Sequence, residues 1–240
     1  MLKWFLFLIC SASCLCANVD RAPPLPPLEN VPFVFVDLAL SSQEKHILQT
    51  LDIGQQQTFN FYGSPAHMQE ALKAFVATIG ANSDEAISTV TCVIARISFA
   101  IVQALDTQAA WVTVRATLAN NAFNTPRWHQ DGYYFAPFTG GPCKFAAVLK
   151  GPSTLFYRLP EELHLEFQDH FQDREYLSRM LDPAFVETVP EGMGALFIVG
   201  DAARAAVHSE PPMQQSRLFF SILPGSPEQI EALRRSRATP

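Results

Sequence analysis

The sequence has little basic charge and few signatures of common enzymes. Its 240 residues include 17 Lys and Arg against 23 Asp and Glu, a formal net charge of -6. Proteins that neutralise nucleic-acid phosphates normally carry a basic surplus, so this balance argues against a nucleic-acid partner. There is no Gly-x-Ser-x-Gly elbow, no His-Glu-x-x-His helix and no Gly-rich phosphate loop. These absences argue against serine hydrolases of that type, zinc proteases and P-loop enzymes.

Cysteine is also scarce, and most of it lies at the start of the chain. Cys10, Cys14 and Cys16 fall within a segment that has a basic residue, an apolar run and small residues in that order. This order predicts a signal peptide over residues 1–17, with an uncleaved anchor as the alternative. The run is shorter than the roughly 20 apolar residues of a membrane span. We therefore expect export, to a periplasm, the exterior or an endoplasmic reticulum lumen, without a stable membrane span after cleavage.

The remaining cysteines, Cys92 and Cys143, are too few for a disulfide framework, and we expect both to be free thiols. A Pro-rich linker is predicted over residues 18–30, where Pro-Pro-Leu repeats favour an extended spacer. The rest, 31–240, is expected to be one domain. It divides into a mainly helical support (31–105), a β-rich core (106–225) and a C-terminal helix (226–240).

Local patterns place the elements of this domain. Capping residues and apolar stripes of period near 3.6 predict helices, and short alternating runs bounded by turn residues predict strands. The predicted helices cover 41–51, 64–80, 82–105, 161–180 and the segment from 227. The predicted strands cover 31–37, 111–118, 144–150, 154–157, 185–189, 195–199, 205–208 and 217–222. Many short strands after a helical start indicate an α+β fold, a barrel or sandwich with helices outside.

One short motif points to chemistry. His129 and Asp131 lie two positions apart and so share a face of an extended segment. His208, from a distant strand, would complete two imidazoles and one carboxylate, a ligand set that suits non-haem Fe(II) and leaves positions open. Arg217, nine residues later, could hold a carboxylate. The sequence therefore predicts a metal centre.

Each of these residues also has an ordinary explanation. His129 and Asp131 could be a local hydrogen-bonded pair in a loop, and His208 could be a core histidine. Asp201 or Glu210 could supply the carboxylate in place of Asp131. A strand-start arginine such as the one at position 217 is often only a solvated strand end.

Taken in order, these pieces resemble the Fe(II)/2-oxoglutarate-dependent dioxygenases, and more closely a bacterial domain family of unknown function. The matching stretches lie between about residues 105 and 223 and are 128–131, 150–154, 194–200 and 207–217. The resemblance implies a double-stranded β-helix, or jelly roll, of the cupin type. It implies that His129, Asp131 and His208 hold Fe(II), and that Arg217 pairs with the distal carboxylate of the co-substrate 2-oxoglutarate.

The chain departs from the family at one position. Some members carry a Ser two residues after the arginine, where this chain has Phe219. A second carboxylate contact would then come from another residue, and the candidates are Tyr133, Tyr134, Lys150 and Arg115.

The expected function is an Fe(II)- and 2-oxoglutarate-dependent oxygenase that hydroxylates an unknown small molecule or protein. The alternative is a non-catalytic, secreted, cupin-like module that binds a ligand or a protein. Export favours the alternative to some extent, because 2-oxoglutarate is a cytosolic metabolite.

Overall fold

A computed structural model describes residues 25, 28, 31–135, 143–200 and 203–238. The predicted signal peptide and most of the predicted linker lie outside these residues. Leu25 and Leu28, the two described residues of the linker, are half-buried and pack against the helical core.

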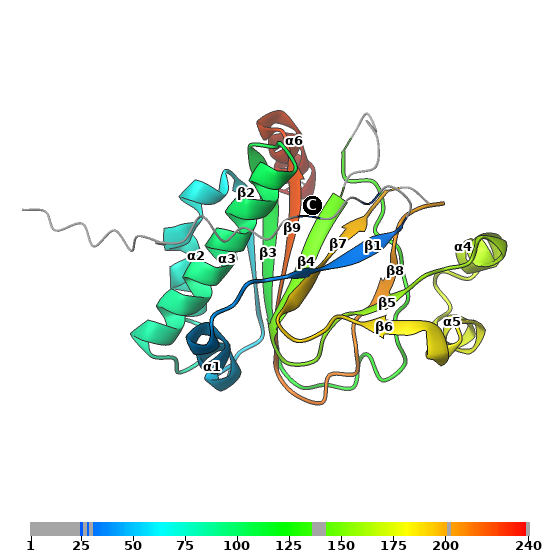
Figure 1. The fold of residues 1–240 in the computed structure, drawn as a ribbon, viewed down its shortest axis with the longest axis horizontal. Coiled ribbons are helices and arrows are strands. Elements are labelled where there is room, and N and C mark those ends of the chain that lie inside the picture. The colour runs from blue at the N-terminus through cyan, green and yellow to red at the C-terminus, as the bar shows by residue number, and fades with distance from the viewer. Residues whose placement is uncertain (1–24, 26–27, 29–30, 136–142, 201–202, 239–240) are drawn as a thin grey trace, which may run out of the picture.

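Two antiparallel sheets form the framework (Figure 1). The larger has six strands in the order β1 (Phe33–Asp37), β7 (Met193–Ile198), β4 (Cys143–Lys150), β9 (Arg217–Gly225), β3 (Ala109–Thr117) and β2 (Gln57–Gly63). The smaller has the order β6 (Val186–Thr188), β5 (Leu155–Tyr157) and β8 (Val207–Ser209). Every neighbouring pair is antiparallel.

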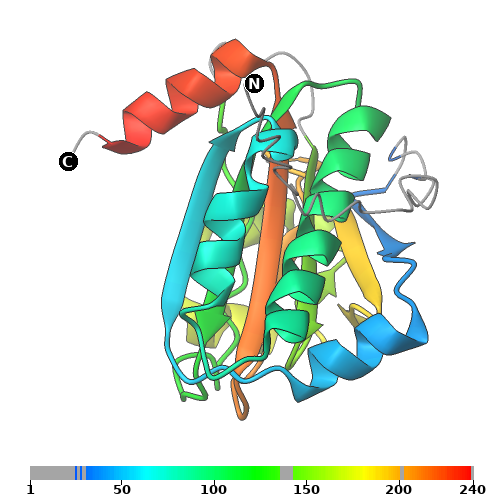
Figure 2. The same cartoon turned by 90° about the vertical axis from the view of Figure 1, so that its left-hand side faces the viewer.

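Helices cover one face of the larger sheet (Figure 2). They are α1 (Ser42–Thr50), α2 (Gln69–Val76), which follows a 3₁₀ turn at Pro65–His67, and α3 (Asp84–Ala104). Ser41 and Glu44 form a reciprocal capping box at the start of α1, and Ser83 caps α3. By length and composition alone α3 could cross a membrane, but most of its apolar window is buried inside the protein, as in a core helix.

The smaller sheet lies against the opposite face. Phe156 of the smaller sheet meets Phe33 and Phe197 of the larger, with ring centroids 4.8 and 5.5 Å apart. Such aromatic contacts bury large apolar areas and hold the two sheets together. Outside the smaller sheet lie 3₁₀ turns at Glu161–Leu163 and Pro183–Phe185, with α4 (His164–Asp169) and α5 (Arg174–Met180) between them. The chain ends in α6 (Pro227–Ala238), which packs against β2 and β3.

Three features of this arrangement differ from the sequence-based expectation. The helix predicted over 64–80 is shorter, because Pro65–His67 form a 3₁₀ turn and α2 covers only Gln69–Val76. The single helix predicted over 161–180 is wrong, because the segment breaks into α4 and α5 around His170. Asp173 stops a continuous helix there, since its carboxylate accepts a hydrogen bond from the Tyr176 amide and starts a new one. Strand β2 was not predicted, and it gives the helical N-terminal third an edge strand.

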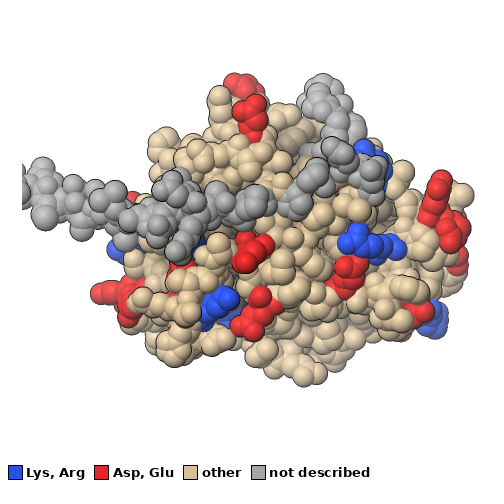
Figure 3. Space-filling model, viewed as in Figure 1, with Lys and Arg blue, Asp and Glu red and all other residues tan. Residues whose placement is uncertain are grey.

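Cys92 and Cys143 are not bonded to each other by a disulfide in the part of the chain that the structure describes. On the face of the molecule seen in Figure 3, acidic and basic side chains are scattered and intermixed, and most of the surface is uncharged.

Candidate metal centre

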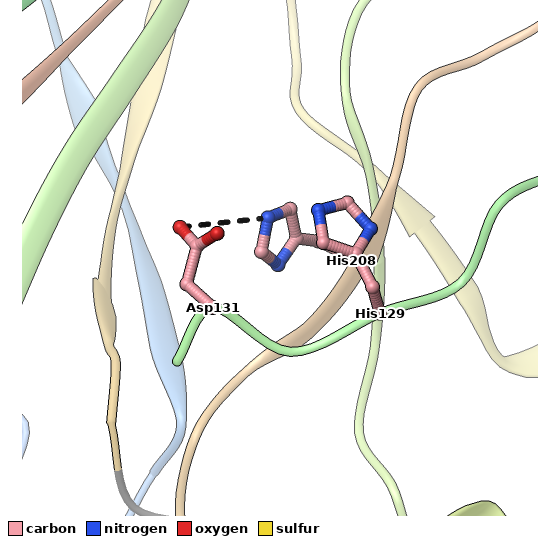
Figure 4. A group of neighbouring side chains, drawn as sticks. All are labelled: His129, Asp131 and His208. Carbon is pink, nitrogen blue, oxygen red and sulfur yellow. Dashed lines mark ion pairs between the residues drawn. The ribbon is translucent and has the colours of Figure 1, made fainter. Parts of the chain in front are cut away.

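The structure brings His129, Asp131 and His208 together. One potential ligand atom from each lies within 4.8 Å of the other two. Figure 4 shows the carboxylate directed at the imidazole of His208, whose Nε2 lies 3.9 Å from Asp131 Oδ2. His129 and Asp131 come from the loop after β3, and His208 is the middle residue of β8. The convergence predicted from their spacing is therefore present.

Backbone pairing places the two imidazoles side by side. His129 and His208 form an antiparallel bridge in which each amide donates to the carbonyl of the other, over 3.0 and 2.9 Å. Directly opposite residues in antiparallel pairs project their side chains on the same side. The two ring centroids are accordingly 4.3 Å apart. The loop thus adds a fourth extended segment beside β8.

Both histidines present the same ring nitrogen to the cluster. His129 Nδ1 lies 2.8 Å from the carbonyl oxygen of Arg127, and His208 Nδ1 lies 3.1 Å from that of Ala206. A carbonyl oxygen only accepts, so each Nδ1 must carry the proton and donate it. Each neutral imidazole is then left with a lone pair on Nε2, the arrangement by which proteins orient metal-binding histidines.

An ion pair holds the two histidine-bearing segments in register. Arg127 Nη2 lies 2.7 Å from Glu210 Oε1, and these residues stand two positions from His129 and His208 on the paired segments. Burial alone would raise the pKa of Glu210, but Arg127 holds it below its usual value. Glu210, considered as an alternative ligand, is therefore committed to Arg127. The other alternative, Asp201, lies outside the described residues.

A lysine from the larger sheet reaches the same carboxylate. Lys144 Nζ is 2.8 Å from Asp131 Oδ2 and 3.3 Å from the hydroxyl of Tyr134. Burial would raise the pKa of Asp131, but Lys144, His208 and His129 together hold it well below its usual range. Burial and the adjacent Asp131 carboxylate raise the pKa of Tyr134. Asp131 is thus ionised, and Tyr134 keeps its proton.

His208 lies in an apolar environment. Its ring centroid is 5.7 Å from that of Phe156 and 5.0 Å from that of Phe197. Burial and the neighbouring His129 lower the pKa of His208 to about 4, while Asp131 acts in the opposite direction. The imidazole is therefore neutral near pH 7 and needs to lose no proton to bind a metal.

Arg217 is buried rather than solvated, which rules out the solvated strand end. Its side chain is 4% exposed, donates from Nε to the Pro152 carbonyl (2.9 Å) and from Nη2 to Thr154 Oγ1 (2.7 Å). The guanidinium lies 4.8 Å from the ring of Phe219, which packs between the two sheets. Burial lowers the pKa of Arg217 to about 10, so it remains a cation at neutral pH.

The other co-substrate candidates lie in different places. Lys150 donates to the Gln49 carbonyl of α1 over 2.7 Å and lines a cavity of about 320 Å³ beside that helix. A contact between Lys150 and a ligand on the metal would require another side-chain position. Tyr133 is largely exposed. Arg115 lies on β3 in alternation with Trp111 and Thr113, and so on the face toward the smaller sheet.

Lys144 is the functional candidate that the sequence analysis missed. It lies thirteen residues after Asp131, at the start of an apolar strand, where a lysine commonly marks a solvated end. Only the strand alternation could have placed it opposite the helix-packed residues Phe145 and Ala147. Its contact with Asp131 depends on the packing of the loop.

The three ligand atoms fit a single metal after a small contraction. Atoms bound to one first-row metal at about 2.1 Å lie about 3 Å apart when the angle between them is near 90°. The separation is 3.9 Å for one pair, about one ångström wider, and at most 4.8 Å for the others, so their excess is at most about two ångströms. Small rotations of the imidazoles and the carboxylate would close that difference.

No protein-family model matches the sequence, and no curated protein does. Among solved structures, the fold is similar to a Pseudomonas putida prolyl-4-hydroxylase, with 13% identity, 88% of this chain and 94% of that chain covered, and a TM-score of 0.41. It is also similar to a Trichoplax adhaerens prolyl hydroxylase in complex with a hypoxia inducible factor peptide fragment (9% identity, coverage 85% and 88%, TM-score 0.40). A third is a viral collagen prolyl hydroxylase from Paramecium Bursaria Chlorella virus-1, in a 2OG complex (11%, 82% and 98%, TM-score 0.38). Similarities this low assign neither a family nor an activity.

Proposed function

We propose that this protein is an Fe(II)- and 2-oxoglutarate-dependent oxygenase that hydroxylates a C–H bond of its substrate. One observation carries the proposal: His129, Asp131 and His208 converge with both Nε2 lone pairs available. Two imidazoles and one carboxylate occupy one face of a metal and leave positions for a co-substrate and dioxygen. Bound Fe(II) would supply the activation of dioxygen, coupled to the oxidative decarboxylation of 2-oxoglutarate.

The path of the chain supports a jelly roll as the fold that carries this site. After β3 of the larger sheet the chain passes to the His129 segment beside the smaller sheet, then back to β4. It next forms β5 and β6 in the smaller sheet, β7 in the larger, β8 in the smaller and β9 in the larger. This alternation gives four segments in each sheet, as in jelly rolls and cupins. Strands β1 and β2 extend the larger sheet at its two edges.

Arg217 is the residue proposed to hold the distal carboxylate of 2-oxoglutarate. It lies on the inner face of the larger sheet, as Phe219 does, and is charged although buried. A guanidinium has five N–H donors, of which two serve Pro152 and Thr154. The remaining donors could form a bidentate contact with a carboxylate. Thr154 and the Pro152 carbonyl would keep the guanidinium oriented before the co-substrate arrives.

The surroundings of the cluster are suited to a reactive metal. Phe156 and Phe197 exclude water from one side of His208, and the carbonyls of Arg127 and Ala206 fix both imidazole orientations. Asp131 remains ionised in this environment because Lys144 lies beside it. The protein therefore supplies oriented neutral imidazoles, one carboxylate and an apolar wall.

One contact favours the alternative, a non-catalytic ligand- or protein-binding module. Lys144 already balances the charge of Asp131, so the cluster is electrostatically satisfied without a metal. A protein that had lost its metal could retain such a pair as a structural device. The two functions therefore differ in whether a divalent metal binds to Asp131 in the presence of Lys144. The oxygenase requires it, and the binding module does not.

The test is to load the purified full chain anaerobically with Fe(II), titrate 2-oxoglutarate and record the visible spectrum. An oxygenase of this type should bind one iron per chain and develop a weak charge-transfer band. His129→Ala and His208→Ala should lose the iron and the band. His164→Ala is the matched control, because His164 is bonded to the Leu159 carbonyl at the start of α4, outside the cluster. Absence of bound metal and of the band in the wild type would refute the proposal in favour of the binding module.

A further inference from the structure

Beside the metal cluster lies an aromatic platform, formed by Tyr62, Trp111 and Tyr134. The rings of Tyr62 and Trp111 are stacked, with centroids 5.8 Å apart and planes 2° from parallel. Tyr134 meets Trp111 edge-on, also at 5.8 Å. The indole N–H of Trp111 and the hydroxyl of Thr113 both donate to Asn60 Oδ1, over 3.0 Å each. The platform is therefore fixed on the inner face of the larger sheet.

Lys144 connects this platform to the cluster. Its ammonium group is bonded to both Asp131 and the Tyr134 hydroxyl, and lies 5.3 Å from the ring of Tyr134 and 5.9 Å from that of Trp111. A molecule resting on the platform would thus have one end at the metal cluster.

Basic side chains gather around the platform. The guanidinium of Arg237, in the last turn of α6, lies 4.0 Å from the ring of Trp111 and 5.8 Å from that of Tyr134. Arg115 is on the same face of β3 as Trp111. Arg115 and Arg237 are both close enough to oppose the rise in the pKa of Tyr134, and Arg115 also acts on Arg217.

The charges of this region do not balance. Among the residues that the structure describes, this region holds four cations, those of Lys144, Arg115, Arg217 and Arg237, and one carboxylate without an arginine partner, that of Asp131, since Glu210 is paired with Arg127. A divalent metal and dianionic 2-oxoglutarate would cancel each other. An excess of three positive charges would remain, in a chain whose net charge is -6. Such a local excess attracts and orients anions.

We infer that the primary substrate is an organic acid whose apolar or aromatic body rests on the platform and whose carboxylate binds Arg237 and Arg115. Two guanidinium groups suit a planar carboxylate, and Trp111 suits a flat or apolar body. Trp111 is only 8% exposed and Arg237 lies over its ring, so the body of the acid would reach the ring as Arg237 turns onto the carboxylate. A cationic substrate would displace Arg237 without offering it a partner, and would lie among the remaining cations. That the acid is a substrate rests on the proposed function, but its binding does not require a metal.

The test uses 3-phenylpropionate and, as its cationic counterpart, 3-phenylpropylamine, each titrated calorimetrically into the metal-free full chain. The acid should bind and the amine should not. Arg237→Gln and Arg115→Gln should each weaken binding of the acid about ten-fold or more. Arg234→Gln is the matched control on the same helix, because its guanidinium is paired with Glu231, and it should leave the affinity unchanged. Circular dichroism of each variant verifies that it is folded.

Two results would overturn the inference: equal or tighter binding of the amine, or an affinity for the acid that Arg237→Gln and Arg115→Gln leave unchanged. Displacement of the acid by equimolar 2-oxoglutarate from metal-free protein would assign these cations to the co-substrate and would overturn it as well. Because the titrations contain no iron, binding of the acid in a protein that forms no charge-transfer band would refute the oxygenase and leave the anion site standing.

Discussion

Replacing Lys144 with methionine should tighten the binding of a divalent metal to the cluster. The ammonium lies 2.8 Å from Asp131 Oδ2. A metal held at about 2.1 Å by the same oxygen, with the ammonium on the far side of that oxygen, would lie about 5 Å from the ammonium. Coulomb's law for charges of two and one at about 5 Å gives a repulsion of about 2 kcal/mol in bulk water, and about 7 kcal/mol at an effective dielectric constant of 20.

The same substitution also raises the free energy of the metal-free state. Lys144 and Asp131 are only 13% and 14% exposed, so methionine would leave a mostly buried carboxylate without its cation. Loss of one partner of such a mostly buried ion pair should cost about 3 kcal/mol of folding stability. Both effects favour the metal-bound state. We therefore expect at least about ten-fold tighter metal binding, about 1.4 kcal/mol, and a larger metal-induced rise in Tm.

The assay is competition of Mn(II), and anaerobically of Fe(II), against a chromophoric chelator, with thermal unfolding recorded with and without EDTA. Lys150→Met is the matched control, because Lys150 is on the same strand but donates to the Gln49 carbonyl of α1. Its metal affinity should equal that of the wild type. If Lys144→Met binds metal no tighter than wild type, charge repulsion is not the dominant effect, and Lys144 instead holds Asp131 in place for the metal.

Three further predictions concern the supports of the cluster. Because the folded-state pKa of His208, about 4, lies below its ordinary value of 6.5, the unfolded chain binds the proton more tightly. Metal-free protein should therefore lose about 3 kcal/mol of its free energy of unfolding as the pH falls from 6.5 to 4. If the free energy of unfolding of His208→Gln falls with pH as steeply as that of the wild type, this prediction is wrong. Arg127→Ala and Glu210→Gln should each weaken metal binding up to about ten-fold, and the double variant should bind no more weakly than either single variant. Additive losses of affinity would mean that the pair does not act as a unit. Gly151→Ala should lower the free energy of unfolding in denaturant by about 2 kcal/mol or more, because φ is +90° there and the new Cβ would lie 2.3 Å from a backbone oxygen. Its control, Gly132→Ala, places a Cβ with nothing within 4 Å and should cost less than about 0.5 kcal/mol.

The sequence predicts those elements whose causes are local. The capping box of Ser41 and Glu44 and the cap of Ser83 act within one helical turn, so both helix starts can be identified without any tertiary contact. The break between α4 and α5 has a local cause as well, the cap formed by Asp173. It was missed because the apolar pattern continues through the break and favours one long helix. Gly132, which follows Asp131, has open space where a Cβ would lie, so the loop has no steric requirement for glycine there.

The candidate site divides in the same way. The two-residue spacing of His129 and Asp131 is a local property, and it correctly places both side chains at the cluster. Whether His208 joins them depends on the pairing of two segments that are far apart in the chain. The sequence gives the order of these segments but not their pairing. The contact of Lys144 with Asp131 and the burial of Arg217 beneath Thr154 depend on how the two sheets pack. Such long-range contacts leave no spacing in the sequence by which they could be recognised.

The metal cluster and the pairing of its two segments depend on each other. Two reciprocal hydrogen bonds between His129 and His208 join the loop to β8, and the ion pair between Arg127 and Glu210 lies two residues further along. One more backbone bond, from the Gly200 amide to the Asp131 carbonyl, holds the loop. So few backbone bonds give a short segment little independent stability. A metal that bridges His129, Asp131 and His208 would therefore cross-link the loop to the smaller sheet beside the single backbone bridge that joins them. Because the unfolded chain lacks this geometry, metal binding and closure of the smaller sheet should occur as one coupled equilibrium.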